Sequence, residues 1–250
     1  MIERPKVTVV TVCYNAEATI EKTMKSIMEQ QYRPIEYILV DGASEDRTKE
    51  IISEYKKLFE EKGIELKFIS ESDTGIYNAM NKGTDLATGE WIAFMNSGDM
   101  YHSKTSLEEL LGNLNGESDV IFGDELICGK ESKTRNSREN YRDIMLKRLP
   151  FCHQAAFVKT ELMKKYHFDE QLQITADYDF FLRLYIEKHT FQYVNCIVCD
   201  YDPEGYSAVN YKRAINETFR AKIKNGIVNP LNPMQQLKRL YWVIKIGMNR

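Results

Sequence analysis

Apolar residues follow two alternating patterns along the first hundred positions. Short apolar runs are typical of buried strands, and they cover residues 7–12, 35–40, 64–69 and 91–95. Between these runs apolar residues return every three or four positions, which predicts helices over residues 16–31, 44–61 and 76–87. Strands and helices that alternate at this spacing form a parallel sheet with helices on both faces, because crossovers between parallel strands are right-handed.

Beyond residue 100 the alternation is less regular. The pattern predicts a helix over residues 103–115, strands over 119–122, 153–158 and 191–201, and an amphipathic helix over 177–187. A hairpin turn is expected near Gly129-Lys130, and the polar stretch 132–148 is a candidate mobile loop. The final residues are expected to form two helices, interrupted near Pro230 and Pro233.

Charge is distributed unevenly along the chain. The 250 residues carry a formal net charge of −3, but residues 206–250 hold nine Lys or Arg and one acid, Glu217, and so carry +8. Residues 1–205 therefore carry −11. We expect an α/β domain over residues 1–205 and a basic helical extension over 206–250, and the extension is expected to meet an anionic surface.

The end of this extension has the composition of a membrane-surface helix. Residues 236–246 combine an apolar face with basic residues, and Tyr241 and Trp242 are types that favour a membrane interface. The stretch is too short and too charged to span a bilayer. The alternative is a helix that packs on the protein's own core or in a dimer.

Nothing in the sequence predicts export or a disulfide framework. The chain has no run of about 20 apolar residues, and its start, Glu3-Arg4-Pro5-Lys6, is polar, so neither a membrane span nor a signal peptide is expected. The expected compartment is therefore the cytoplasm. Cys196 and Cys199 have CxxC spacing in an apolar, strand-like run without a second pair, which favours buried thiols over a metal or redox site.

Each of the first four predicted strands ends in polar residues, namely 11–15, Asp41, 70–73 and 96–99. Ligands of open α/β sheets bind outside the carboxyl ends of the strands. Asp99 alone would be read as a helix cap, but four polar strand ends at one edge of a sheet indicate a ligand cleft.

The cleft offers carboxylates rather than a glycine-rich phosphate cradle. Neither GxGxxG nor GxxxxGK[ST] is present, which argues against a dinucleotide-binding or P-loop enzyme. Asp41 or Asp73 can accept hydrogen bonds from a base or a ribose, and Asp99 can hold a divalent cation that neutralises a diphosphate. Asp177 and Asp179 begin a helix and point in different directions, so that one can serve as a general base for a hydroxyl.

Several ordered blocks of the sequence resemble glycosyltransferase family 2, and most closely its bacterial O-antigen and exopolysaccharide branch. The blocks are residues 9–15, 40–48, 71–83 and 87–90, and the likeness extends over about residues 5–205. The resemblance implies the GT-A fold, an α/β Rossmann-like three-layer sandwich with a mostly parallel central sheet. It also implies a nucleotide-sugar donor, often UDP-linked, a divalent cation (Mn or Mg), and inversion at the anomeric carbon.

The resemblance also assigns roles by position. The implied donor-binding residues are Thr11, Asn15, Asp41, Asp73, Lys82 and Asn96. Asp99 matches the metal-binding acid, and Asp177 matches the catalytic Asp. His153, Gln154 and Asp179 are candidates for contact with the acceptor or the donor phosphates.

Two departures from the family pattern bear on these roles. Asn96 and Gly98 stand where many members have acids, so that a metal would rest on Asp99. Ala176 replaces the Glu that precedes the catalytic Asp, which leaves Asp177 and Asp179 to be separated by experiment. A lone His in an apolar strand is more often structural, so the role of His153 is left open.

The expected activity is inverting glycosyl transfer, of the hexosyltransferase type, in surface polysaccharide biosynthesis. Asp177 would deprotonate a hydroxyl of a saccharide acceptor, which by resemblance is lipid-linked and lies at the inner face of a membrane. The alternatives are a non-catalytic nucleotide-sugar-binding or scaffold protein, and a nucleotidyltransferase, whose Gly/Arg/Lys-rich first loop is missing from residues 13–18. No nucleic-acid partner is expected, and a homodimer is left open.

Overall fold

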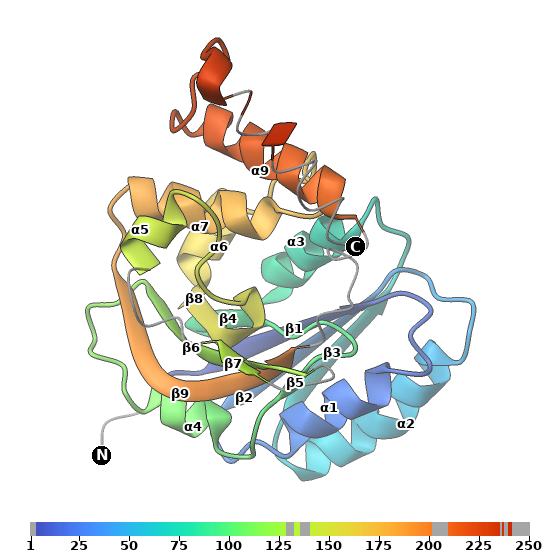
Figure 1. The fold of residues 1–250 in the computed structure, drawn as a ribbon. Helices are drawn as coiled ribbons and strands as arrows, with labels where there is room; N and C mark the ends of the chain where they lie inside the picture. The colour runs from blue at the N-terminus through green and yellow to red at the C-terminus, as the bar shows by residue number, and fades with distance from the viewer. Residues whose placement is uncertain are drawn as a thin grey trace.

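One sheet organises the molecule. The computed structural model describes residues 4–128, 133–135, 141–201, 210–235, 237, 240 and 241. Nine strands of this described part form the sheet, in the order β3-β2-β1-β4-β8-β6-β9-β5, with β7 paired to β6. Helices cover both faces of the sheet (Figure 1), which confirms the expected three-layer α/β architecture.

The first four strands run parallel. Strand β1 (Val7–Cys13) lies between β2 (Ile35–Asp41) and β4 (Trp91–Phe94), and β3 (Glu65–Ser70) continues the sheet beyond β2. The register places the last residue of β1 opposite the last residue of β2, and that residue opposite the end of β3. The polar ends of these strands therefore lie at one edge, as the sequence predicts.

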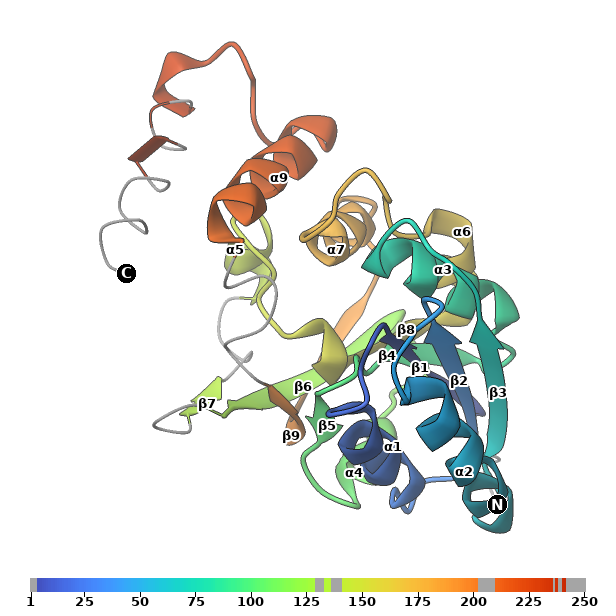
Figure 2. The same ribbon diagram turned by 90° about the vertical axis from the view of Figure 1, so that its right-hand side faces the viewer.

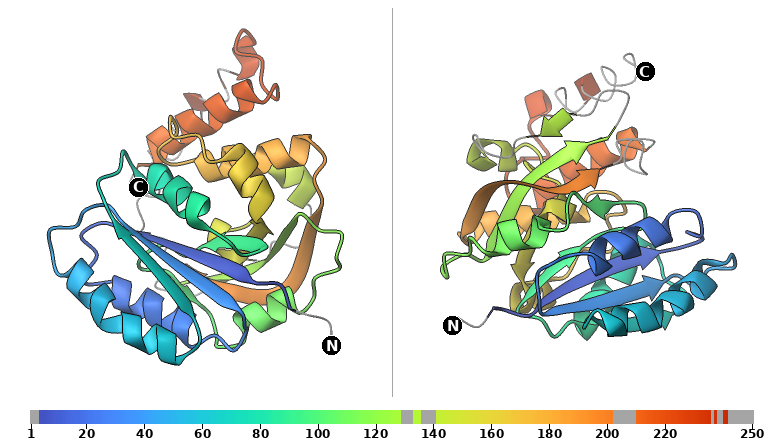
Figure 3. Two further views of the ribbon diagram at one scale, coloured as in Figure 1. Left: turned by 180° about the vertical axis from the view of Figure 1, so that it is seen from behind. Right: turned by 90° about the horizontal axis from the view of Figure 1, so that it is seen from below.

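The helices between these strands divide over the two faces. Helices α1 (Ile20–Met28) and α2 (Thr48–Glu61) cover one face, and α3 (Ile76–Leu86) covers the other (Figure 3). Alternate side chains of β1 explain the division, because Val9 packs with α1 and α2 whereas Val10 packs with α3. Gly83 lets α3 approach the sheet closely, since a Cβ there would lie 2.4 Å from Val10.

The second half adds antiparallel pairs beside β4. Strand β8 (Ala156–Lys159) pairs with β4, β6 (Val120–Ile127) pairs with β8, and the long strand β9 (Phe191–Tyr201) runs parallel to β6. The remaining elements here are β5 (Met100–Tyr101), α4 (Ser106–Leu111), β7 (Lys133–Arg135), α5 (Tyr141–Met145), α6 (Thr160–Tyr166) and α7 (Ala176–Ile186). Of these, β5, α5 and α6 are elements that the sequence pattern did not predict.

Two predictions for this half were wrong in part. The expected strand 153–158 opens as a 3-10 turn, η1 (His153–Ala155), and becomes a strand only at Ala156. Its first residues turn because the amide of Ala155 bonds to the carbonyl of Cys152 (3.0 Å). The expected loop 132–148 contains β7 and α5, whereas residues 136–140 and the expected turn at 129–130 lie outside the described residues.

Helix α9 (Tyr211–Lys224) confirms the first helix of the extension and lies beside α7 (Figure 2). Residues 233–235 are helical, while residues 236, 238–239 and 242–250 lie outside the described part. No helix among the described residues has the length and apolar character needed to cross a bilayer.

A buried charge joins the strands at the edge opposite the polar strand ends. Glu36 is fully buried, and its carboxylate accepts hydrogen bonds from Lys67 Nζ (2.6 Å), Thr8 Oγ1 (2.6 Å) and the amide of Thr88 (2.7 Å). Burial raises the pKa of Glu36, but the hydrogen bonds from Lys67, Thr8 and Thr88 outweigh burial and lower the pKa to about 2. This carboxylate therefore ties β1, β2, β3 and the segment before β4 together in its ionised form.

We expect Glu36→Gln to lower the free energy of unfolding in a pH-dependent way. The folded-state pKa of about 2 lies below the ordinary value of 4.5, so ionised Glu36 stabilises the fold above about pH 4.5, and this contribution is lost as the pH falls toward 2. Urea unfolding at a series of pH values measures the difference from the wild type. Glu54→Gln, on the exposed side of α2, is the matched control. A difference for Glu36→Gln that stays constant with pH would contradict this account.

Candidate functional site

Two adjoining cavities open at the carboxyl ends of the parallel strands. Their volumes are about 480 and 510 Å³, and Ile76, Tyr77 and Gln173 line both of them. The first cavity, of about 480 Å³, is the one lined by Tyr14 and Asp73, and the second, of about 510 Å³, is the one lined by Asp99 and Asp177. Because the two cavities share lining residues, they lie next to each other, and one extended ligand can reach both.

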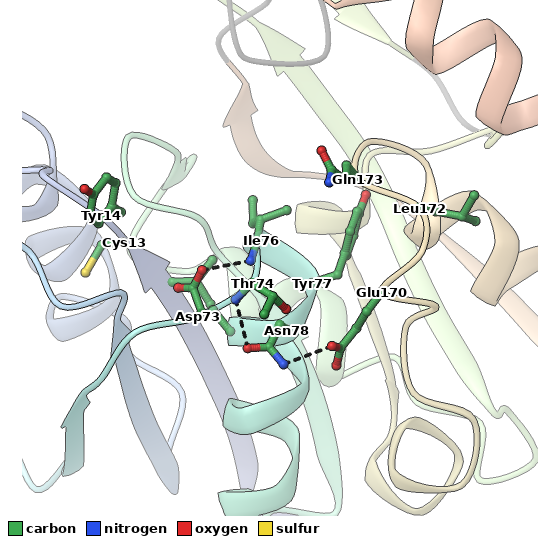
Figure 4. A pocket seen from close by; sticks show the side chains of 13 residues that line it. Cys13, Tyr14, Asp73, Thr74, Ile76, Tyr77, Asn78, Glu170, Leu172 and Gln173 are labelled. Carbon is green, nitrogen blue, oxygen red and sulfur yellow. Dashed lines mark hydrogen bonds between the residues drawn. The ribbon is translucent and has the colours of Figure 1, made fainter.

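Tyr14 and Asp73 give the first cavity an aromatic ring and a carboxylate (Figure 4). Tyr14, at the end of β1, is 63% exposed. Asp73 accepts a hydrogen bond from the amide of Gly75 (2.9 Å), which fixes the carboxylate at the start of α3. Its other oxygen lies against Gly42, where a Cβ would come within 2.6 Å, so that only glycine fits without displacing Asp73. A planar base can stack on Tyr14 and donate to Asp73.

Thr11 and Asp41 are fully buried beneath the first cavity and line neither cavity. The hydroxyl of Thr11 donates to the carbonyl of Met95 (2.7 Å). Asp41 accepts hydrogen bonds from the amide of Ser44 (3.0 Å), the hydroxyl of Ser44 and the hydroxyl of Ser70 (2.6 Å). These two residues therefore hold the loops that carry the site.

Asn15 and Lys82 likewise contact the protein rather than either cavity. The side-chain oxygen of Asn15 accepts from the amide of Glu45 (2.9 Å), and Asn15 has a positive φ of 46°. Lys82 Nζ donates to the carbonyl of Ser72 and contacts the carboxylate of Glu71, both at 2.8 Å. Lys82 thus steadies the segment that leads to Asp73.

The second cavity brings together five of the residues expected at the site. Asn96, Asp99, His153, Gln154 and Asp177 all line it, although they come from the loop after β4, from η1 and from α7. Gln154 donates to Asp99 (2.6 Å). His153 Nδ1 lies 3.3 Å from a carboxylate oxygen of Asp177, and Asn96 Nδ2 lies 3.3 Å from His153 Nε2. At these distances His153 Nε2 can accept from Asn96, and Nδ1 faces the carboxylate of Asp177.

The carboxylate of Asp177 is held in the cavity wall by its neighbours. One oxygen accepts from the amide of Tyr178 (2.8 Å) and lies 3.2 Å from the hydroxyl of Tyr77. Burial, followed by the charge of Asp177, raises the pKa of Tyr77 well above its usual value, so the phenol stays protonated as a donor. The side chain of Asp177 keeps 18% of its surface exposed, which leaves it accessible to a hydroxyl.

Asp179 points to the other side of α7. It is fully buried and lines neither cavity. Its carboxylate contacts Arg183 (3.3 Å) and Lys224 (3.0 Å), and it accepts a hydrogen bond from the side-chain amide of Asn225 (2.7 Å). This placement does not fit the suggested contact with the acceptor or the phosphates. Asp177 thus faces the cavity, whereas Asp179 faces α9.

The donor atoms near Asp99 fit a hard divalent cation that is completed by ligand phosphates. No three His, Cys, Asp or Glu side chains gather into a metal cluster within the described residues. Mg²⁺ and Mn²⁺ in phosphate sites, however, need only one or two carboxylates in addition to the phosphates and water. Asn96 Oδ1 is buried and, among the described residues, has no hydrogen-bond partner, so the same loop offers a second oxygen.

The sequence reasoning missed two residues of these walls. Tyr14 is an exposed aromatic residue directly after the buried run of β1, and this position was the available signal. Lys22, on α1, is a cation that lines the second cavity and can face an anionic ligand. It lies on the polar face of its helix, where the sequence pattern alone indicates only a solvated residue.

Comparison with known proteins places this geometry in a family. Residues 8–190 match the model of glycosyl transferase family 2. An uncharacterized glycosyltransferase of Mycobacterium tuberculosis, MT1564, is 30% identical over 216 residues, which are 82% of this chain and 78% of the relative. A PGL/p-HBAD biosynthesis glycosyltransferase of Mycobacterium bovis is 27% identical over 206 residues, which are 80% of this chain and 78% of that protein.

Solved structures share the fold. TarS residues 1–349 of S. aureus, in complex with UDP, align with a TM-score of 0.70 at 19% identity, over 96% of this chain and 70% of that one. The mannosyltransferase PcManGT of Pyrobaculum calidifontis, in complex with GDP-Man and Mn²⁺, aligns with a TM-score of 0.69 at 18% identity, over 93% and 67%. These likenesses confirm the Rossmann-like GT-A fold, and the match over most of the sequence shows that the chain belongs to glycosyl transferase family 2.

Proposed function

We propose that this protein transfers a sugar from a nucleotide-sugar donor to a hydroxyl of a saccharide acceptor, with inversion at the anomeric carbon, in bacterial surface polysaccharide biosynthesis. The observation that carries the proposal is the partly exposed carboxylate of Asp177 in the same cavity as Asp99, beside the cavity of Tyr14 and Asp73. Support comes from TarS in complex with UDP-GlcNAc, from PcManGT in complex with GDP-Man, and from the relative named for PGL/p-HBAD biosynthesis.

The donor is proposed to extend across both cavities. Its base stacks on Tyr14 and donates to Asp73, and its diphosphate extends toward Asp99 and Lys22. A divalent cation, Mn²⁺ or Mg²⁺, would be held by Asp99 with Asn96 and would supply charge stabilisation for the leaving diphosphate. Thr11, Asn15, Asp41 and Lys82 are proposed to support donor binding through the loops they fix.

Asp177 is proposed to act as the general base. An acceptor hydroxyl that enters the second cavity gives its proton to the carboxylate, and its oxygen attacks the anomeric carbon from the side opposite the diphosphate. His153 Nδ1 and the hydroxyl of Tyr77 keep the carboxylate oriented. A single displacement of this kind inverts the configuration. The anomeric configuration of the product, read by NMR against that of the donor, tests this step.

Asp177→Asn is expected to remove transfer while donor affinity stays near that of the wild type. Loss of a general base costs on the order of 10²-fold or more in rate, whereas the donor contacts proposed above do not involve Asp177. The measurement pairs transfer or hydrolysis rates with calorimetry of UDP. Asp179→Asn is the matched control, because the same change on the opposite side of α7 should lower stability more than the rate. An inactive Asp179→Asn that is stably folded would show that the assignment within this pair is wrong.

Asp99→Asn is expected to abolish the dependence of donor binding on the metal. Asp99 is the only acid of the 96–99 loop, and an amide is a weaker ligand for a hard cation. A thermal-shift screen of UDP- and GDP-sugars, with and without Mn²⁺, first identifies the donor for the wild type, and UDP calorimetry with Mn²⁺ then compares the variant. Asp85→Asn, an exposed change on α3, serves as the control. Equal Mn²⁺-dependent binding in Asp99→Asn would exclude the metal role.

The extension is proposed to bring the cleft to the inner face of an anionic membrane, where a lipid-linked acceptor is available. Leu231, Met234, Leu237, Leu240 and Tyr241 are all more than half exposed. Exposed apolar residues with nearby basic ones favour the interfacial plane of a membrane. Each basic residue near an anionic leaflet contributes about 1 kcal/mol, so the +8 extension can bind reversibly.

Liposome co-sedimentation tests the membrane proposal. We expect the wild type to sediment with anionic vesicles, to sediment less with neutral ones, and to dissociate in high salt. Replacing Leu231, Leu237 and Leu240 with Ser should weaken sedimentation without lowering transfer to a soluble acceptor. Sedimentation that is independent of lipid charge and salt would instead favour packing within the protein or a dimer.

A further inference from the structure

A carboxylate from the C-terminal extension holds the start of α7. Glu217, on α9, is only 2% exposed. One of its oxygens accepts hydrogen bonds from the amides of Ile174 (2.8 Å) and Thr175 (3.3 Å). The other oxygen accepts from Arg213 Nε (2.8 Å), one turn earlier on α9. Both oxygens are thus committed, and two of these bonds reach the backbone that leads into α7.

Glu217 binds the backbone just before α7, where the N-cap residue makes no side-chain hydrogen bond. Thr175 stands at the N-cap of α7, where a hydroxyl ordinarily accepts a hydrogen bond from the first turn. Its side chain makes no such bond, and its Oγ1 is buried without a hydrogen-bond partner among the described residues. A carboxylate near a helix N-terminus also interacts favourably with the helix dipole. The backbone that enters α7 is therefore held from α9, in addition to the bond that Asp177 accepts from the amide of Tyr178.

The same segment is held from the opposite side by the catalytic cavity. The hydroxyl of Tyr77 lies 2.8 Å from the carbonyl of Ile174 and 3.2 Å from the carboxylate of Asp177. The amide and the carbonyl of Ile174 are thus bound by two different elements, α9 and α3. Asp177 follows Thr175 by two residues, in the first turn of α7. A shift of this short segment must move the carboxylate of Asp177.

We propose that Glu217 is a positioning residue for Asp177, so that the extension completes the active site although it lies outside the two cavities. This inference rests on the proposed role of Asp177 as the base. Without the Glu217 carboxylate, two buried amides lose their acceptor, and the segment 174–177 relaxes away from Tyr77. A mutation far from the reacting atoms can lower the rate by about 10²-fold when it displaces a catalytic group by about 1 Å.

Hydrogen exchange tests the contact itself. In Glu217→Gln one neutral oxygen replaces two charged ones, so the weaker acceptor should let the amides of Ile174 and Thr175 exchange about tenfold faster. Arg213→Ala is the matched control, because it removes the other partner of Glu217 and leaves the two backbone bonds in place. Equal protection of this segment in wild type and Glu217→Gln would overturn the proposal.

Kinetics test the action through Asp177. Rates are measured with whichever of UDP-GlcNAc, UDP-glucose and GDP-mannose the wild type hydrolyses fastest. The kcat should fall by about 10-fold in Glu217→Gln and by up to about 100-fold in Glu217→Ala, with donor KM within about twofold, whereas Arg213→Ala stays near wild type. If Glu217→Ala does not fold, the isosteric Gln variant gives the same comparison.

The double variant separates positioning from general loosening. Because Glu217 acts through Asp177, Asp177→Asn with Glu217→Gln should be no slower than Asp177→Asn alone. If the rate losses of the two single variants multiply in the double variant, the positioning role is overturned. A wild-type rate in Asp177→Asn would instead show that the proposed base is wrong and would remove the catalytic reason for Glu217. Unchanged hydrogen exchange in Glu217→Gln would refute the positioning role alone.

Discussion

The parallel pairing of β1 with both β2 and β4 is the constraint on which the site depends. Together with the pairing of β2 and β3, it sets the ends of these strands at one edge of the sheet. Cys13 of β1 lies opposite Asp41 of β2, and Asp41 lies opposite Ser70 of β3. Tyr14, Asp73 and the loop with Asp99 then follow at one edge of the sheet. The second half of the chain joins this edge through β8, which pairs with β4 and delivers η1 directly before it. Both cavities exist because these two halves meet there.

Local patterns in the sequence predict the strands and helices of the first half, because each strand is a short, mainly apolar run and each helix has one apolar face. They could not predict that Asp41 is buried by Ser44 and Ser70, because that depends on the folded loops. The 3-10 turn brings His153 to Asp177 and Gln154 to Asp99, and neither contact can be read from the local sequence. Asp179 was equivalent to Asp177 in sequence, and only its partners on α9 distinguish the two. Residue types indicate chemistry, whereas long-range partners decide which group remains available for it.

We propose two roles for the C-terminal extension, which its charge alone does not separate. Some of its basic residues are paired within the protein, since Lys224 contacts Asp169 and Asp179, and Arg213 contacts Glu217. The pair of Lys224 with Asp179 joins α9 to α7, whereas Arg213 and Glu217 both lie on α9. Beyond this contact lie exposed apolar residues that can meet an external surface, namely Leu231, Met234, Leu237 and Leu240. A single segment can thereby link the position of the cleft at a membrane to the geometry of its base.

The most direct test of the account is a crystal structure of the protein in complex with UDP and Mn²⁺. The account predicts that the uracil lies against Tyr14 and Asp73 in the first cavity, that the diphosphate extends to Asp99, and that the second cavity remains open beside Asp177 for the sugar and the acceptor. UDP bound away from Tyr14 and Asp73, or a diphosphate that points away from Asp99 and Asp177, would contradict the division of the site into these two cavities.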